Sequence, residues 1–412
     1  MDRSILLKVA LLAGVLAVAR LDAAEPNYRF ASVRTIDGPC CGDWGSSISV
    51  DTEGAVFVAG RRGGLDLNGN GVVDLDTYGS PDSMVFKAFG TSEWLDWVKG
   101  PGGVGEDFAS GVAPDGQGGA YVVGQFDGRM QVGKETVTGS GRKGGFLARF
   151  DRRGEVVWVR AIGGAGDDRI AQVAVDSEGS VFVVGTVAGS VDVDRDGTVD
   201  VDARGASAML LASFDPTGAL RFARATEGTA RTMGWFVSVG REGELHAGGH
   251  YMAGTLDLDG DGQDDIEFKS IAGRVWEHDL DANGLLMRLS PAGELRWMRR
   301  YAAAVASVTS NGSRIVVTGT YTDGNLRHTF TIFGDDSDVP YAARPLRMVT
   351  GFMPPATPNW GRTSAVTARS RASRYATSSG TYSWLFTTSR NDGGAHSGLT
   401  AIDAGPSPVR ST

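Results

Sequence analysis

Cysteine is scarce in this chain: the 412 residues contain two, so a scaffold held together by many disulfides is excluded. Basic charge is also in short supply, because 40 lysines and arginines stand against 49 acidic residues and leave a formal net charge of −9. That balance argues against a nucleic-acid partner, which needs a basic face. No run of 18 apolar residues occurs, so the sequence predicts no transmembrane span after export.

Glycine, by contrast, is abundant, with 60 residues, roughly twice the usual share of about 7%. It follows no collagen-like period. Each interior glycine costs a helix about 1 kcal/mol, and no stretch of the chain has a convincing helical period. We therefore expect an all-β fold.

The first residues resemble a secretory signal. Arg3 and Lys8 provide positive charge, residues 9–19 form an apolar run, and Ala17-Val18-Ala19 matches a cleavage pattern. The sequence thus predicts a signal peptide over residues 1–24 and a protein that is secreted or displayed at the cell surface.

A repeat organises the rest of the chain. An apolar strand that ends in glycine recurs at residues 56–60, 121–124, 181–185, 245–249 and 315–319. Each copy is preceded by a shorter strand and followed by a second hairpin, whose turns include residues 151–154 and 215–218. Four short strands in roughly 60 to 75 residues are the content of one propeller blade.

These copies predict a β-propeller of about six four-stranded blades, with seven as an alternative. Residues 25–338 hold the repeats, of which the first four are well formed. Residues 339–412 are either degenerate last blades or a poorly folded tail, because residues 339–391 lack acidic side chains entirely. The strand at residues 28–33 resembles the last strand of a blade, so we expect it to pair with the final blade and close the ring.

Particular motifs carry a family resemblance. They are the tryptophan-containing strands, the Asp-x-x-Gly hairpin turns and a Gly-Gly-x-Gly-x-Asp step, which reads Gly102-Gly103-Val104-Gly105-Glu106-Asp107 in one copy. The pattern resembles the bacterial β-propeller repeat family, often called SBBP repeats. The resemblance covers roughly residues 28–320 and implies a secreted or cell-surface propeller, usually without an assigned reaction.

Three segments share the pattern D-x-[DN]-x-[DN]-G-x-x-D. Side-chain oxygens at positions 1, 3, 5 and 9, with a carbonyl at position 7, can wrap a hard cation, and glycine at position 6 permits the sharp turn. The first loop offers Asp66, Asn68, Asn70, Val72 and Asp74. The second offers Asp192, Asp194, Asp196, Thr198 and Asp200, and the third Asp257, Asp259, Asp261, Gln263 and Asp265.

Oxygen-only ligands favour Ca²⁺ over zinc, so we expect these loops to bind calcium. The first loop has two charged ligands and should bind most weakly. Position 12 lacks the bidentate glutamate of an EF-hand, which places the expected dissociation constant at about 10⁻⁴ to 10⁻³ M. The alternative is a set of solvated acidic turns, since aspartate, asparagine and glycine favour turns.

No strong catalytic motif is present. His246 and His250 lie on one face of a strand, but side chains four residues apart there are about 13 Å apart, too far to chelate one ion. The matched aspartates Asp43, Asp107 and Asp168 fit a structural role in turns.

Other residues admit structural interpretations. The vicinal Cys40 and Cys41 fit a disulfide, an intermolecular link or free thiols. Core packing is the expected role of the repeated tryptophans, which are Trp97, Trp158, Trp297 and Trp360.

The favoured function is that of a monomeric, calcium-stabilised propeller that binds a protein or polysaccharide without chemistry. The alternative is an exported hydrolase or lyase acting on polysaccharide or peptide at the propeller axis, with His250 as the first residue to examine.

Overall fold

Antiparallel β-sheets build the whole of the described structure, and no helix occurs among these residues. The computed structural model describes residues 4–9, 15–22, 28–35, 43–67, 72–89, 95–240, 243–252, 254–257, 266–268, 283–301, 304–310, 314–323, 326–335, 373–376, 382–391 and 395–404. The all-β prediction is therefore confirmed.

Four blades follow one another along the chain, each an antiparallel sheet in sequence order. The first consists of β4 (Trp44–Val50), β5 (Val56–Arg62), β6 (Asp82–Ala88) and β7 (Leu95–Lys99). The second consists of β9 (Phe108–Pro114), β10 (Ala120–Val132), β11 (Glu135–Phe150) and β12 (Val156–Ile162), with β8 (Gly102–Gly103) paired to the end of β10. The third consists of β13 (Arg169–Val175), β14 (Val181–Val191), β15 (Val201–Phe214) and β16 (Leu220–Ala225). The fourth consists of β17 (Thr232–Val239), β18 (Leu245–Tyr251), β21 (Asn283–Leu289) and β22 (Leu295–Tyr301).

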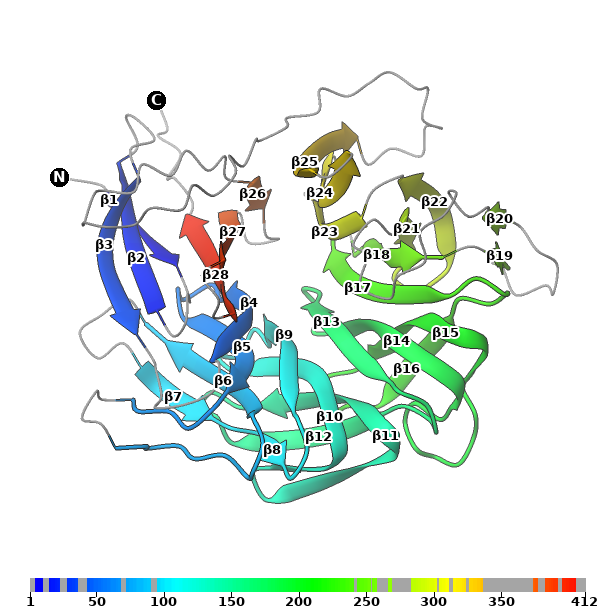
Figure 1. Ribbon diagram of the computed structural model, residues 1–412, viewed down its shortest axis with the longest axis horizontal. Helices are drawn as coiled ribbons and strands as arrows, with labels where there is room; N and C mark the ends of the chain where they lie inside the picture. Colours follow the sequence, from blue (N-terminus) through cyan, green and yellow to red (C-terminus); the bar gives the residue numbers. More distant parts are fainter. Residues whose placement is uncertain are drawn as a thin grey trace.

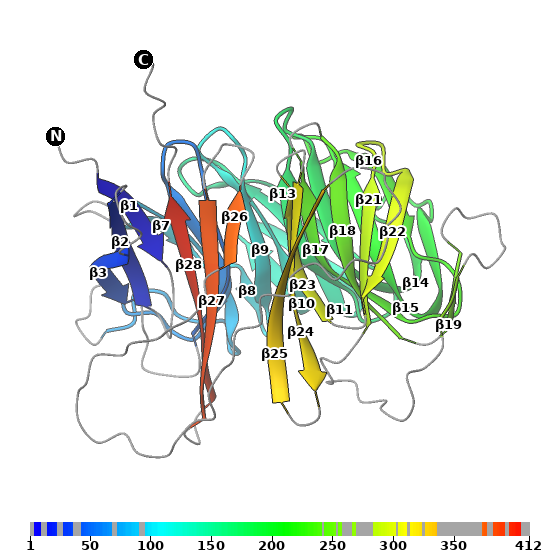
Figure 2. The same ribbon diagram turned by 90° about the horizontal axis from the view of Figure 1, so that it is seen from above.

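The blades stand around a common centre, with β4, β9, β13 and β17 nearest the middle (Figure 1). Seen from above, neighbouring sheets stand side by side with their strands roughly aligned (Figure 2). This is a propeller-like arrangement, as the repeat predicts.

Smaller sheets complete the described chain. A two-stranded sheet, β19 (Gly254–Leu256) with β20 (Ile266–Phe268), extends the fourth blade. Three three-stranded sheets are formed by β23 (Ala304–Ser310), β24 (Arg314–Asp323) and β25 (Leu326–Asp335); by β26 (Ser373–Ala376), β27 (Tyr382–Asn391) and β28 (Ala395–Ala404); and by β1 (Ser4–Val9), β2 (Val15–Asp22) and β3 (Tyr28–Thr35).

The amino-terminal strand β3, expected to complete the last blade, pairs with β2. Strand β1 of the same sheet lies beside β28. The six-blade count, the closure of the ring and the signal peptide over residues 1–24 stay predictions. Among the described residues, no helix combines the length and the apolar character needed to cross a bilayer.

Apolar side chains from neighbouring blades form the core. One cluster joins Phe57 of the first blade to Phe146 of the second, and another joins Tyr121 of the second to Leu210 of the third. A third cluster packs residues of β14 against residues of β18. Each sheet thus hides its apolar face only against the next copy, which is the packing that the repeat predicts.

Tryptophans of the first and second blades each donate a hydrogen bond to the following blade. The indole N–H of Trp97 donates to the carbonyl of Arg152 at 3.2 Å, and that of Trp158 donates to the carbonyl of Pro216 at 3.1 Å. Trp97 also stacks on Phe150, with ring centroids 6.2 Å apart. The packing role expected for these two side chains is confirmed, whereas Trp360 lies outside the described residues.

The innermost strand carries a β-bulge at the same place in five sheets. One residue is left out of each ladder, directly after the residue that pairs with the recurring glycine. The five extra residues are Ser46, Ser110, Ala171, Trp235 and Ala306. The sheet β23–β24–β25 therefore repeats the inner part of a blade.

This bulge explains the recurring glycine. At Gly60, Gly124 and Gly185, a Cβ atom would collide with the carbonyl oxygen of the inner-strand residue before the pair. The backbone approaches too closely there for any side chain.

Three aspartates support the blades at equivalent positions. The carboxylates of Asp43, Asp107 and Asp168 each accept a hydrogen bond from the main-chain N–H twenty residues later, at 2.8, 3.2 and 2.9 Å. In the fourth blade the carbonyl of Arg231 accepts from the Met252 N–H at 2.8 Å instead. The structural role predicted for these aspartates is confirmed.

Candidate metal centre

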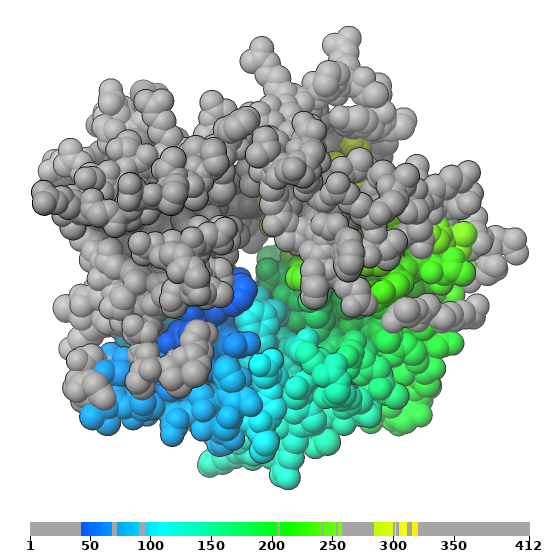
Figure 3. All heavy atoms as spheres, in the orientation of Figure 1, coloured from blue at the N-terminus to red at the C-terminus, as the bar shows by residue number. Residues whose placement is uncertain are grey.

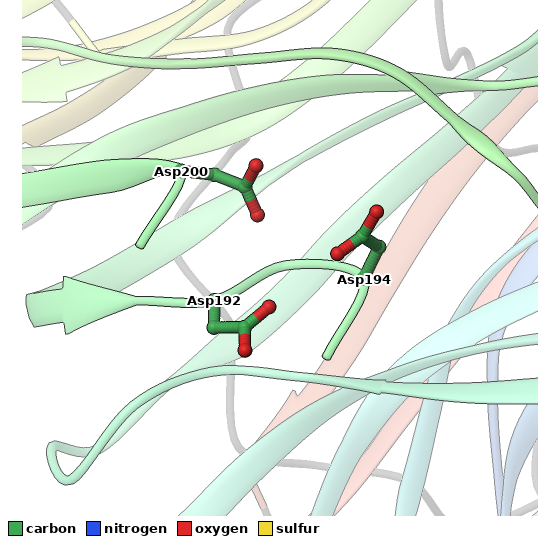
Figure 4. Close-up of side chains that lie close together, drawn as sticks. All are labelled: Asp192, Asp194 and Asp200. Carbon is green, nitrogen blue, oxygen red and sulfur yellow. The ribbon is translucent and has the colours of Figure 1, made fainter. Parts of the chain in front are cut away.

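The second acidic loop gathers three carboxylates. Residues 192–200 connect β14 to β15, and one oxygen each of Asp192, Asp194 and Asp200 lies within 4.8 Å of the others. Figure 4 shows the three side chains turned toward the space between them. Positions 1, 3 and 9 of the sequence pattern therefore meet, as predicted.

Hydrogen bonds hold this loop in shape. The Val193 N–H donates to Asp200 Oδ2 at 2.7 Å, and the Asp200 N–H donates to the Val191 carbonyl at 3.0 Å. Val191 and Val193 are fully buried in the core between blades. The loop is thus fastened to the core at its start, while its carboxylates remain partly accessible.

Position 5 faces elsewhere. Asp196 is not part of the three-carboxylate group; its Oδ1 accepts from the Thr198 N–H at 2.7 Å. Its own N–H donates to Asp192 Oδ1 and Asp194 Oδ1, each at 3.2 Å. A ligand role for Asp196 would require its side chain to turn.

The backbone at position 4 is left-handed, with a φ of +63° at Arg195. In the sequence, the first and third loops have Gly69 and Gly260 at position 4, and glycine is the residue that tolerates a positive φ best. The Arg195 side chain reaches the second blade, since its Nε donates to the carbonyl of Ala161 on β12 at 3.1 Å.

The first loop is held by the same two hydrogen bonds as the second loop. The Leu67 N–H donates to Asp74 Oδ2 at 2.8 Å, and the Asp74 N–H donates to the Leu65 carbonyl at 2.7 Å. These bonds join the same pattern positions as the two in the second loop. Asp66, Val72 and Asp74 belong to the described residues, while Asn68 and Asn70 lie outside them.

In all three loops, the residue before position 1 pairs across the ladder with the residue after position 9. The pairs are Leu65 with Leu75, Val191 with Val201, and Leu256 with Ile266. In the third loop Asp257 is buried, with its N–H donating to the Glu227 carbonyl at 3.2 Å. The other predicted ligands of this loop, Asp259, Asp261, Gln263 and Asp265, lie outside the described residues.

The second blade lacks the loop. Its β10–β11 hairpin pairs Val132 directly with Glu135, so Gly133 and Lys134 alone make the connection. The second copy therefore has no acidic loop at this point of the blade.

The carboxylates of the second loop are electrostatically uncompensated. Among the described residues, no lysine or arginine forms an ion pair with Asp192, Asp194 or Asp200. Desolvation raises the pKa of Asp200, and the neighbouring carboxylates add to this against the hydrogen bond from Val193. A divalent cation would relieve this repulsion.

His250 is engaged in a contact between sheets. It is 7% exposed, and its imidazole donates a hydrogen bond to the carbonyl of Val305 on β23. Burial lowers its pKa to about 4, so the ring is neutral at pH 7. His246, fully buried on the same strand, packs instead near Trp297, with ring centroids 6.0 Å apart.

Sequence reasoning missed two residues on the inner strands. The guanidinium carbon of Arg169 on β13 lies 3.9 Å from the ring centroid of Trp235 on β17. Trp235 is the extra residue of its bulge and is 36% exposed. A bulge leaves no mark in an apolar pattern, so no sequence signal singled out this pair.

Comparison with known proteins gives a fold-level picture only. No family model matches the chain, and no curated protein matches it. Solved structures with a similar course include the WD40 domain of Pan2 from Neurospora crassa, at 10% identity and a TM-score of 0.36, covering 89% of this chain and 91% of that one. Polysaccharide lyase Uly1 matches at 8% identity and a TM-score of 0.42, covering 96% and 89%. BamB from Moraxella catarrhalis matches at 12% identity and a TM-score of 0.28, covering 75% and 89%. The propeller assignment rests on the blades of the chain itself.

Proposed function

We propose that the protein is an exported, calcium-stabilised β-propeller that acts as a binding module. The observation that carries the proposal is that the acidic loops share the same backbone pairing and hydrogen bonding. Three loops in different blades have the same flanking pair, and two of them have the same pair of hydrogen bonds from position 9. Turns that are merely solvated would not require the same pairing and hydrogen bonds in different blades.

Calcium fits the donor set best. The predicted ligands are oxygen atoms only. Ca²⁺ accepts irregular coordination geometries, which suits a loop whose donors are not arranged as a regular octahedron or tetrahedron. The missing bidentate glutamate favours a dissociation constant of about 10⁻⁴ to 10⁻³ M, which is adequate for an extracellular module. The ion would hold together a loop that buries little apolar surface.

Binding without chemistry agrees with the environment of His250. This residue was the first candidate for a general base in an exported hydrolase or lyase. Its N–H is used in a contact with the Val305 carbonyl, and its low pKa of about 4 makes the imidazole a weak base at neutral pH. Propeller loops from many blades meet on one face, which is a natural setting for recognition.

Thermal unfolding tests the calcium proposal. We expect the melting temperature to rise when millimolar Ca²⁺ replaces EDTA, through binding to the folded state, and Mg²⁺ to have a smaller effect. Asp194→Asn should reduce the shift, because it removes one of the three convergent carboxylates. Glu178→Gln, in an exposed hairpin turn, serves as the charge-matched control and should leave the shift unchanged. Equal melting temperatures in calcium and EDTA would contradict the proposal.

Export and binding need their own measurements. Fractionation of cells that express the full chain should place the protein outside the cytoplasm without residues 1–24, as mass spectrometry would show. Glycan and peptide arrays should return a ligand with no turnover. Product formation that His250→Gln abolishes in a folded protein would favour the enzyme instead.

A further inference from the structure

An arginine and a tryptophan meet where the inner strands of two blades lie side by side. Arg169 begins β13, and Trp235 lies on β17, which packs against β13. Figure 3 shows the molecule hollowed near the middle, where these strands run. The 3.9 Å separation of guanidinium and indole places them in direct stacking contact.

Among the residues that the structure describes, no carboxylate forms an ion pair with Arg169. Two other arginines of the described blades do have such a partner: Arg62 pairs with Asp82 at 3.6 Å and Arg149 with Asp115 at 3.0 Å. For Arg169, burial alone lowers the pKa, and no carboxylate acts against it. In a chain with a net charge of −9, burying this cation without a carboxylate from the described residues beside it costs free energy.

Trp235 is much larger than the residues at the equivalent bulge positions. The other four bulge residues are two serines and two alanines, and both serines donate a hydrogen bond to the neighbouring blade. Trp97, in contrast, is 8% exposed and donates its N–H to the next blade. Trp235 remains 36% exposed, so part of the indole is open to solvent.

His250 forms the neighbouring wall without supplying charge. Its ring centroid lies 5.7 Å from that of Trp235, at an interplanar angle of 47°. Because the imidazole is neutral, it neither compensates Arg169 nor competes with an incoming anion.

We propose that Arg169 and Trp235 form a binding site for an acidic saccharide, with the guanidinium holding a sugar carboxylate and the exposed part of the indole packing against the sugar ring. Arginine matches a carboxylate with two parallel hydrogen bonds. The proposal rests on the binding role proposed above and names its ligand class. An acidic peptide would use the cation but has no flat ring to place on the indole, so a saccharide fits both residues better.

Titration calorimetry with trigalacturonate tests the site. The wild-type protein should bind the acid, and the fully methyl-esterified trisaccharide should bind at least about tenfold more weakly, since esterification removes the charge-assisted hydrogen bonds. Arg169→Gln should cause a similar loss, Arg169→Lys a smaller one, and Trp235→Ala a loss for both ligands. Arg153→Gln removes an exposed positive charge from a hairpin turn and should leave the affinity unchanged.

Folding and ligand class are controlled separately. Melting temperatures within a few degrees of wild type show that the variants fold, and Arg169→Lys keeps the test informative if Arg169→Gln does not fold. Equal binding of acid and ester, no binding of the acid, or preference for a glutamate-rich peptide would each overturn the saccharide site. If arrays still return a ligand whose binding ignores Arg169→Gln, this site fails while the binding module stands.

Discussion

The hydroxyl of Ser110 donates a hydrogen bond to the carbonyl of Ile170, 2.6 Å away in the next blade. Ser46, the bulge residue of the preceding blade, reaches the Ala109 carbonyl in the same manner. Ala109 and Ile170 occupy the same register position, since each pairs with the recurring glycine of its blade. The bulge thus turns a side chain out of one sheet to fasten the next.

In the fourth blade, His250 makes the equivalent contact. The bulge residue of the fourth blade is Trp235, which has no hydroxyl, and the imidazole of His250 donates to Val305 instead. Val305 pairs with the recurring Gly319 and is therefore equivalent to Ala109 and Ile170.

Replacing Ser110 by alanine should lower the free energy of unfolding by about 1 kcal/mol, because a hydrogen bond between blades is lost. Chemical denaturation monitored by tryptophan fluorescence measures this. Ser49→Ala, on the inner strand of the first blade, is the matched control. Equal effects of the two substitutions would mean that the bulge serine adds nothing.

Gly185→Ala should be more damaging, by about 2 kcal/mol or more, since a methyl group at this position meets the Arg169 carbonyl. Gly139→Ala provides the comparison, because its added Cβ would find its nearest atom, the Gly141 oxygen, at 3.3 Å. Melting temperatures of both variants decide the point. A tolerated Gly185→Ala would show that the inner strand can move aside.

The two roles of Asp200 can be separated. Asparagine keeps an oxygen that accepts from the Val193 N–H, so Asp200→Asn should preserve the calcium-free stability while reducing the calcium-induced rise in melting temperature. Asp200→Ala should lose both, with a cost of about 1 kcal/mol in EDTA. An undiminished calcium response in Asp200→Asn would remove this residue from the proposed ligand set.

Two buried titratable groups, His250 and Asp107, should change the free energy of unfolding in opposite directions as the pH rises. The pKa of His250 falls from 6.5 to about 4 through burial, so the unfolded chain binds the extra proton in that interval. Stability should therefore decrease as the pH falls from 6.5 toward 4. Denaturant titrations at several pH values should show that His250→Gln lacks this decrease.

Asp107 acts in the other direction. Burial raises its pKa from 3.8 to about 7, with the nearby Asp82 adding to the rise, so the folded state holds the proton. Its contribution to stability should fade as the pH rises from 3.8 through 7. Asp107→Asn, which cannot ionise, should lack that loss. A variant that keeps the wild-type slope would refute the assignment.

Patterns within one strand or turn were readable from the sequence. The glycine at residue 185, the Asp-x-x-Gly turns and the tryptophan strands each mark one local conformation. For example, the Asp151 carboxylate accepts from the N–H groups of Arg153 and Glu155 at 2.8 and 2.9 Å, and Gly154 adopts a φ of +74°. Local hydrogen bonding and glycine geometry produce such signatures directly.

Contacts between blades leave no comparable trace. The bonds from Ser110 and His250 join residues 60 and 55 positions onward, respectively, and no spacing rule connects them. The pairing of Arg62 with Asp82 was equally hidden, because the sequence does not show that the end of β5 and the start of β6 are both buried. In the acidic loop, the spacing anticipated that the carboxylates at positions 1, 3 and 9 converge, but Asp196 at position 5 lies outside this group.

The hydrogen bonds of Trp97 and Trp158 both point toward the carboxyl terminus of the chain. Trp97 and Trp158 each reach forward to a hairpin that the ribosome makes more than fifty residues later. In the first and second blades this hydrogen bond can therefore form only after the following hairpin has been synthesised. Each of these two blades thus depends on sequence later in the chain for one of the contacts that hold it in place.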